Sequence, residues 1–397
     1  MLHLILSDIK AGRSVLVIDP KADLVNDILE RIPEDRADEV VVIDPSDPCP
    51  VGFNPFAFKN YRNPTLIADA ILAVLKEIFS DSWGIRSQDI LSGALLTLAQ
   101  TEGASLLWLP TLLTDEAFRN KVTSGLKDEI GLKPFWEHFN SMRENEQRQE
   151  IAPVMNKLRQ FLLRPGLRNV LGQSNPKFSL ADLFYKRRIV LVPLNRGVIG
   201  AESARLLGSL IVGLTWTLAL SRTNIPPERR HIVSVFIDEL QDYLSLPTSL
   251  SDALAQARGV GLALTMAHQY RDQLSPEIRA GIDANARNKI IFGLNSKDAK
   301  DIATMAPSLT ALDFMSLSRY QIYTSFQQKG RNTGWVQGKT MPAPLAIQTA
   351  AELRAKSMAM YGKPASEVEA EYLKLLLSDD LSEENFSGTY IGRKKKL

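Results

Sequence analysis

The amino-acid sequence predicts an α/β fold, in which helices flank a parallel β-sheet and an all-α domain interrupts it. Short runs of β-branched and aromatic residues are typical of strands buried on both faces. Two of these runs flank an amphipathic segment at 23–31, which is the spacing of a strand–helix–strand unit. From Pro64 to Phe184 the apolar residues instead recur with helical spacing, and this stretch has no convincing strand pattern.

Six runs have the strand pattern, and the last is expected to be the final strand of the core. They cover residues 14–19, 40–44, 188–192, 232–237, 262–267 and 289–292. The predicted helices outside the all-α stretch cover residues 2–10, 23–31, 200–221, 249–258, 275–286 and 298–306. Residues 321–326 and 335–337 are expected to form an edge hairpin, followed after Pro344 by two charged helices.

Within the all-α stretch, helices are expected at 66–79, at 90–100 and at 144–163, the last bent near Pro153. A linker with four prolines, Asp44 to Pro55, precedes this stretch. The predicted organisation has four parts. They are the first part of an α/β domain at 1–60, the all-α insert at 61–185, the second α/β part at 186–343 and a charged tail at 344–397.

Composition bounds the possible classes of protein. The chain has 397 residues, 45% of them hydrophobic and 23% charged, which is typical of a soluble globular protein with two or three domains. A formal net charge of +2 does not by itself indicate a nucleic-acid partner. Cys49 is the single cysteine, so the chain has no internal disulfide framework and suits a reducing compartment. With only four histidines, a structural zinc site is not expected.

No segment has the pattern of a signal peptide, because the first ten residues lack a basic region followed by a cleavage site. The most apolar segment, Leu206 to Leu220, is shorter than the roughly 20 residues that cross a bilayer. It is therefore predicted to be a buried helix.

The strongest chemical signal is the strand at 232–237, which ends in Asp238 and Glu239. Ligands bind at the carboxyl ends of strands in open α/β sheets. Asp238 is suited to hold Mg²⁺ directly or through water, and Glu239 to polarise an attacking water, as in a Walker B segment. The plainer interpretation is that an apolar strand ends in acids where it reaches solvent.

Three further polar residues adjoin predicted strands. Gln269 ends the strand at 262–267, Arg258 ends the preceding helix, and Arg287 precedes the strand at 289–292. A glutamine at such a place senses a γ-phosphate or orients water, and an arginine at a subunit boundary stabilises transferred charge in trans. The plainer alternatives are a strand-end cap for Gln269, a partner of the helix dipole for Arg258 and a surface ion pair for Arg287.

Lys21 follows the strand at 14–19 and is placed either near a nucleotide crevice or in solvent. His268 has no second ligand type near it in the sequence, so a packed histidine is expected.

The sequence resembles the TraG/TraD coupling proteins of type IV secretion, within the FtsK/HerA group of RecA-like motor ATPases. The resemblance covers about residues 1 to 340. It rests on Asp238-Glu239, on the spacing from these acids to Arg258 and then to Ala267-His268-Gln269, and on three shorter segments. Those segments are Asp19-Pro20-Lys21-Ala22-Asp23-Leu24, Gly52-Phe53-Asn54-Pro55 and Ser82-Trp83-Gly84-Ile85-Arg86.

The resemblance implies a RecA-like sheet of the P-loop NTPase type, with ATP and Mg²⁺ as cofactors. It implies Asp238 and Glu239 as Walker B, Gln269 as γ-phosphate sensor and Arg258 as arginine finger. Lys21 and Arg287 are further candidate nucleotide contacts because of their places at strand ends that face one crevice. The implied assembly is a homo-hexamer that pumps DNA into a secretion channel, with relaxase and channel components as partners. The implied location is cytoplasmic, at the bacterial inner membrane only through upstream segments.

The sequence departs from the family's pattern at one important point, the phosphate-binding P-loop. A P-loop has the pattern G-x-x-x-x-G-K-[ST], and Gly338-Lys339-Thr340 is rejected because it follows the core strands and opens no helix. In the family the P-loop immediately precedes a helix such as 2–10, and the strand before the P-loop is central in the sheet. The expectation is therefore a chain that starts just after its P-loop, does not hydrolyse ATP alone and leaves neighbouring strands unpaired.

Two alternatives stay open at this point. One is a non-hydrolysing docking or assembly subunit of a secretion machine. The other is a HerA- or FtsK-like DNA motor that is not linked to secretion.

Overall fold

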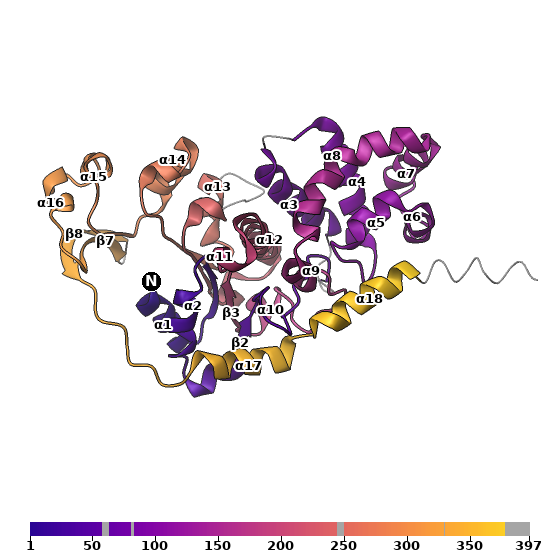
Figure 1. Ribbon diagram of the computed structural model, residues 1–397. Coiled ribbons are helices and arrows are strands. Elements are labelled where there is room, and N and C mark those ends of the chain that lie inside the picture. Colours follow the sequence, from indigo (N-terminus) through magenta and orange to yellow (C-terminus); the bar gives the residue numbers. More distant parts are fainter. Residues whose placement is uncertain (58–62, 81–82, 244–249, 329, 378–397) are drawn as a thin grey trace, which may run out of the picture.

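The computed structural model describes residues 1–57, 63–80, 83–243, 250–328 and 330–377, and it confirms the predicted α/β class (Figure 1). Its centre is a five-stranded sheet in the order β2-β3-β1-β4-β5, and every neighbouring pair is parallel. The strands are β1 Ser14–Asp19, β2 Val40–Val42, β3 Ile189–Pro193, β4 Val233–Ile237 and β5 Leu262–Met266.

Strand β1 occupies the middle of this sheet. It pairs with β3, which comes about 170 residues later, and on its other side with β4. All residues of β1, β3 and β4 are buried, as expected for strands covered on both faces. Strand β5 pairs only with β4 and is partly exposed, so it forms one edge of the sheet.

Different helices cover the two faces. On one face, α1 Leu2–Lys10, α2 Asp23–Leu29 and α17 Ala350–Tyr361 pack against Val15, Val17 and Leu191. On the other face, α12 Ala201–Leu220 packs against the alternate side chains, including Leu16 and Val192. The alternation of a strand's side chains thus divides the apolar residues of β1 between two cores.

Between β2 and β3 the described chain is helical, as predicted. The helices are α3 Pro64–Ile78, α4 Ile85–Gln100, α5 Trp108–Thr114, α6 Glu116–Thr123, α7 Leu132–Ser141, α8 Glu144–Leu162, α9 Pro165–Leu171 and α10 Asp182–Tyr185. Asn63 caps α3 by accepting a hydrogen bond from the Leu66 amide, and Pro64 fills the first helical position. Helix α8 continues through Pro153. The core of this insert is continuous with the α12 face of the sheet.

Helix α12 joins the insert to the sheet. Together with the turn after it, residues Ala201–Asn224 are long and apolar enough to cross a membrane, but 89% of the most apolar window is buried inside the protein. The predicted buried helix is therefore confirmed. Gly208 lies against the Tyr243 ring, where an added Cβ would come within 2.4 Å of a ring carbon, so a larger residue would push the ring away.

The remaining short elements connect these layers. They are α11 Arg196–Ile199, α13 Leu250–Ala257, α14 Pro276–Asn285 and the 3₁₀ turns η1 Glu34–Glu39, η3 Ser221–Asn224, η4 Pro227–Arg229, η5 Leu240–Asp242 and η6 Arg271–Gln273.

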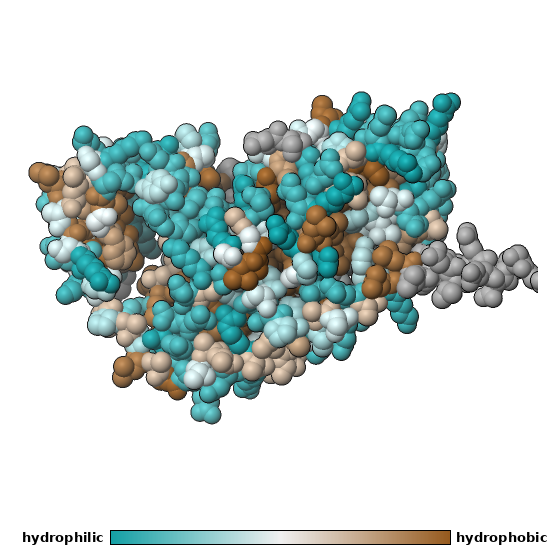
Figure 2. Space-filling model, in the orientation of Figure 1, coloured by the Kyte–Doolittle hydropathy of each residue, from teal (hydrophilic) through white to brown (hydrophobic). Residues whose placement is uncertain are grey.

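The segment at 289–292 forms a strand but not in the central sheet, so its assignment to the core was wrong. Strand β6 Lys289–Ile291 pairs antiparallel with β7 Gln321–Gln328, which pairs with β8 Arg331–Lys339. The predicted hairpin is thereby confirmed and is longer than expected. With α15 Ser296–Ala303 and α16 Ala311–Met315, these strands enclose a small core around Phe314. Figure 2 shows hydrophobic surface over this part.

After β8 the chain returns across the sheet as a strap, residues 341–377, that ends in α17 and α18 Ala365–Leu377. The Val42 amide of edge strand β2 donates to Ser357 Oγ of α17, which satisfies one edge N–H group. Helix α18 contacts the insert through the Arg168–Glu369 ion pair. The two helices predicted after Pro344 are confirmed, and the basic run at 393–396 lies outside the described residues.

The strap is anchored on two acids that follow β2. Arg354 of α17 contacts Asp44 Oδ2 at 2.8 Å and Asp47 Oδ1 at 3.9 Å. Burial, with a smaller contribution from the Asp44 charge, raises the pKa of Asp47 to about 6, and Arg354 only partly offsets this. The folded state therefore binds the Asp47 proton more tightly than the unfolded state, so the stability that this group contributes is lost as pH rises from the ordinary pKa of 3.8 to about 6.

We expect Asp47→Asn to stabilise the protein by about 1 kcal/mol near pH 7.5, because the amide removes a half-buried charge. The gain should shrink as pH falls below about 6, where wild-type Asp47 takes up a proton. Urea unfolding at both pH values measures this, with the exposed Asp35→Asn as matched control. A less stable variant at pH 7.5 would show that the Arg354 contact outweighs the desolvation of Asp47.

Candidate functional site at the carboxyl edge of the sheet

The candidate site begins where β4 ends. The Asp238 amide still donates to Ile18 O at 3.1 Å, so Asp238 continues the pairing with β1. Glu239 then takes a left-handed conformation with φ of 53°, which is uncommon outside glycine and redirects the chain into η5. The turn leaves Glu239 only 7% exposed, with its carboxylate at the sheet edge.

The carboxyl groups of Asp19, Asp238 and Glu239 lie near enough at this edge to influence one another electrostatically. Burial raises the pKa of Asp238 above its ordinary value, and the charges of Glu239 and Asp19 raise it further. Asp19 is 1% exposed and accepts hydrogen bonds from the Lys21 and Val25 amides, so its carboxylate caps the start of α2. Asp238 accepts the Glu239 amide at 3.2 Å. The local excess of acid would be relieved by a cation.

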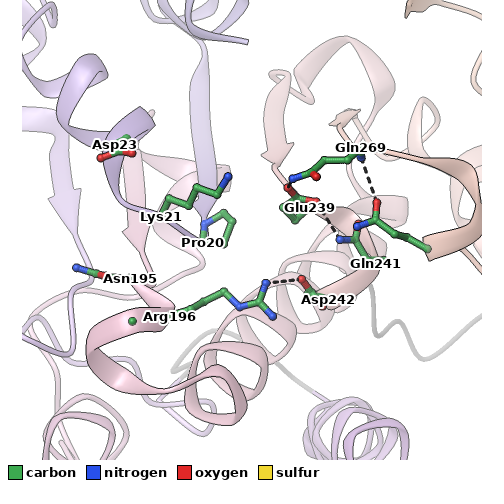
Figure 3. A pocket seen from close by; sticks show the side chains of 11 residues that line it. Pro20, Lys21, Asp23, Asn195, Arg196, Glu239, Gln241, Asp242 and Gln269 are labelled. Carbon is green, nitrogen blue, oxygen red and sulfur yellow. Dashed lines mark hydrogen bonds and ion pairs between the residues drawn. The ribbon is translucent and has the colours of Figure 1, made fainter. Parts of the chain in front are cut away.

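Two glutamine side chains orient the Glu239 carboxylate (Figure 3). Gln269, just after β5, donates from Nε2 to Glu239 Oε1, and Gln241 Nε2 donates to Glu239 Oε2 at 2.9 Å. The backbone N–H of Gln269 donates to Gln273 Oε1 at 3.2 Å, which holds the loop after β5 in place. Neighbouring strands thus bring an acid and an amide 30 residues apart into direct contact.

The Glu239–Gln269 pair faces a cavity of about 680 Å³. Its lining comes from the turns after β1, β3, β4 and β5, which is the crevice that parallel strands form at their carboxyl ends. The lining residues are Pro20, Lys21, Asp23, Asn195, Arg196, Gly197, Glu239, Gln241, Asp242, Gln269 and Gln273.

Sequence reasoning missed the ion pair on the far wall of this cavity. Arg196 Nη1 lies 2.7 Å from Asp242 Oδ2, with both side chains partly exposed. Arg196 follows Asn195, which has φ of 31° and turns the chain after β3. The signal in the sequence was the polar turn directly after an apolar strand, the same signal that identified Asp238.

Several buried polar atoms near the site have no hydrogen-bond partner within the described chain: Gln241 Oε1, Tyr243 Oη and His268 Nδ1. Unpaired buried groups are uncommon in native proteins, and here they fit a site that gains partners with ligand or water. Burial lowers the pKa of His268, so its imidazole is neutral at pH 7.

The structure separates the predicted site residues into two groups. Glu239, Gln269 and Lys21 line the cavity, and Asp238 adjoins Glu239. Arg258 follows α13 and precedes β5, so it lies at the amino edge of the sheet, on the opposite side. Arg287 is exposed and precedes β6 of the second sheet. Within one chain, neither arginine joins the acids.

The acids fit Mg²⁺, which is held in such sites by one or two carboxylates, waters and phosphate oxygens. No cluster of three or more metal-ligating side chains occurs among the described residues, so a dedicated all-protein cage is absent there. A phosphate-binding loop is not found in this sequence, so no hydrolytic step is assigned to these residues alone.

Comparisons with known proteins agree with this geometry. The family described as "Type IV secretory system Conjugative DNA transfer" matches residues 5–293. None of the curated proteins matches the sequence significantly.

Among solved structures, the fold is similar to the bacterial conjugative coupling protein TrwBdeltaN70 in its unbound monoclinic form (TM-score 0.63, 17% identity, 88% of this chain and 83% of that chain). It is similar to the trigonal form of TrwBdeltaN70 with sulphate (0.62, 18%, 88% and 84%). It is also similar to VirB4 of Thermoanaerobacter pseudethanolicus (0.54, 14%, 87% and 86%).

We expect Mg²⁺ to stabilise the wild-type chain and to lose this effect in Asp238→Asn, measured by thermal unfolding. At about ten times its dissociation constant, the ion should add about 1.4 kcal/mol. Without Mg²⁺ the variant should be at least as stable as wild type at pH 7, because the raised pKa shows that the charge is unfavourable there. The exposed Asp69→Asn is the control. An unchanged response to Mg²⁺ in Asp238→Asn would remove the metal assignment.

Proposed function

We propose a function from the premise that this chain belongs to the type IV secretory system conjugative DNA transfer family. It is the motor core of a coupling protein that uses ATP to drive DNA towards the secretion channel. The observation that carries this proposal is the Glu239–Gln269 pair, which lies beside Asp238 and faces the cavity at the carboxyl edge. A glutamine side chain beside an acid at such an edge is suited to orient an attacking water next to a phosphate.

Each side chain has a distinct task in this proposal. Asp238 holds Mg²⁺, which neutralises phosphate charge when nucleotide is bound. Glu239 accepts hydrogen bonds at both carboxylate oxygens, which fixes its orientation for polarising water. Gln269 moves its hydrogen bond between Glu239 and a phosphate oxygen, and so reports the state of the site. Lys21 supplies positive charge from the turn after β1.

The arginines act between subunits. Arg258 lies on the edge of the sheet opposite to the acids, so its proposed role as an arginine finger requires a second copy of the chain. A head-to-tail ring such as a hexamer brings opposite edges of neighbouring subunits together. Arg287 is proposed as a further contact at this boundary. Relaxase and channel components are the proposed protein partners, in the cytoplasm at the inner membrane.

One observation favours a second candidate function. The sequence has no P-loop motif, and the cavity is lined by only two cationic side chains from the described residues, Lys21 and Arg196. This is compatible with a non-hydrolysing docking subunit, in which Asp238 and Glu239 have no catalytic task. The two functions differ in what substitution of Glu239 does.

We expect Glu239→Gln to abolish DNA-stimulated ATP hydrolysis in a protein that joins a P-loop segment to this chain. The loss should be about 100-fold or more in kcat, with nucleotide affinity nearly unchanged, because the amide is isosteric but cannot accept a proton. Thr111→Ser, in the insert, is a control that keeps a hydroxyl for Tyr372. Hydrolysis that survives Glu239→Gln would contradict the Walker B assignment and favour the docking subunit.

A further inference from the structure

The crevice at the carboxyl edge contains an amide side chain to which the proposed function gives no task. Gln273 ends the η6 turn after β5 and lines the cavity. Its Oε1 accepts hydrogen bonds from the backbone N–H groups of Gln269 and Tyr270, at 3.2 and 3.1 Å. The oxygen of the Gln273 amide therefore faces the backbone of its own turn.

These two bonds fix the orientation of the Gln273 side chain. A backbone N–H group needs an acceptor, so the oxygen of the side-chain amide, and not its nitrogen, must face the turn. The Nε2 atom is then directed away from the backbone, and it forms no hydrogen bond with any described residue. Because Gln273 is half-buried and lines the cavity, its Nε2 group is a donor of fixed orientation that a ligand can use.

The turn that carries Gln273 is also held from outside the crevice. The Arg271 guanidinium makes a bidentate contact with Asp283 of α14, at 2.9 and 2.7 Å, and the Arg271 side chain is only 13% exposed. The backbone N–H of Arg271 donates to Asp298 Oδ2 of α15 at 3.1 Å. Bidentate arginine–carboxylate pairs fix geometry as well as adding energy. The Gln273 donor is therefore held in place before any ligand binds.

The two other glutamine donors that adjoin Glu239 are already occupied. Nε2 of Gln269 and Nε2 of Gln241 both donate to the Glu239 carboxylate, one to each oxygen. Either of them must break this bond before it can contact a ligand. The Nε2 group of Gln273 has no such bond to a described residue, so it can donate to a ligand at no cost in existing hydrogen bonds.

Lys21 is a second available donor, on a different wall of the cavity. It lies in the turn after β1 and forms no ion pair with any described residue. Figure 3 shows its amine pointing across the crevice toward Glu239. One strand, β4, separates β1 from β5, so the turns that carry Lys21 and Gln273 start about 10 Å apart. Donors on separate walls suit a negatively charged group that lies between them.

We propose that Gln273 is a further ligand-binding residue of the crevice, whose Nε2 group donates a hydrogen bond to a phosphate oxygen of a bound polyphosphate. The class of ligand follows from polarity, because an N–H donor needs an acceptor and a lysine favours a negative charge. This role rests on the proposed function and adds a contact to it. Gln269 changes its partner when phosphate binds, whereas Gln273 keeps its orientation and receives the phosphate.

The plainer role for Gln273 is to cap its turn and nothing more, and two substitutions separate the two roles. Gln273→Glu keeps an oxygen for both backbone N–H groups but loses the Nε2 donor. Gln273→Met has a similar shape and no charge, and it loses both the acceptor and the donor. Gln160→Glu, at an exposed position of α8, is the matched control that adds the same charge outside the crevice.

The measurement is the affinity of the full chain for inorganic triphosphate with Mg²⁺, by isothermal titration calorimetry, together with thermal unfolding of each variant without ligand. We expect binding to weaken about tenfold in Gln273→Met, and further in Gln273→Glu, where the carboxylate also repels phosphate. Gln273→Glu should unfold at the wild-type temperature or above, because a charged acceptor strengthens the cap, whereas Gln273→Met should unfold earlier. The side-chain N–H signals that Gln273→Glu removes from the NMR spectrum should shift in the wild-type chain when triphosphate is added.

Wild-type affinity in Gln273→Glu, a loss confined to Gln273→Met, or an equal loss in Gln160→Glu would overturn this role and leave Gln273 as a turn cap. The proposed function would then still stand if Asp238→Asn abolished binding in the same assay. No binding of triphosphate by the wild-type chain would count against both the role of Gln273 and the proposed nucleotide site. If the Gln273 variants lost affinity for a single-stranded oligonucleotide and kept it for triphosphate, the assignment to a polyphosphate would be wrong.

Discussion

The parallel pairing of β1 with both β3 and β4 is the constraint on which the rest of the structure depends. Because the three strands run in one direction, every turn that follows them lies at one edge and every turn that precedes them lies at the other. This pairing brings Asp19, Asn195 and Asp238 together although they are far apart in sequence. It also collects the cations before the strands on the opposite edge. The polarity of the sheet is thus the source of the molecule's division into an acidic crevice and a basic surface.

The all-α insert and the C-terminal strap both serve this sheet. The insert leaves after β2 and returns at β3, and its core is continuous with the α12 face, so it is not an independently packed body. The strap covers the α1–α2 face and satisfies the edge strand β2 through Ser357. By contrast, β6 to β8 form a separate small sheet with its own core around Phe314. The loop after β5 links this part to the crevice, because the Arg271 backbone amide donates to Asp298 Oδ2 of α15.

Much of this fold could be predicted because buried parallel strands are locally distinctive. The runs at 14–19 and 232–237 are apolar throughout, and the acids that follow them mark the crevice. The partner of a strand is not a local property, which is why 289–292 was recognised as a strand but assigned to the wrong sheet. The Arg196–Asp242 pair joins residues 46 positions apart that match no motif. The exposed cations Arg13, Arg187 and Arg229 escaped attention because only the register shows that the turns before β1, β3 and β4 are neighbours.

The proposed function requires a metal ion at the carboxyl edge of the sheet. Crystals of the chain soaked in Mn²⁺, a substitute for Mg²⁺ with strong anomalous scattering, would locate it without reference to activity. We expect one anomalous peak within coordination distance of Asp238, directly or through water, on the side of the crevice that Glu239 and Gln269 face. A peak bound only elsewhere, or none beside Asp238 at saturating Mn²⁺, would contradict the proposal that this edge is a nucleotide site.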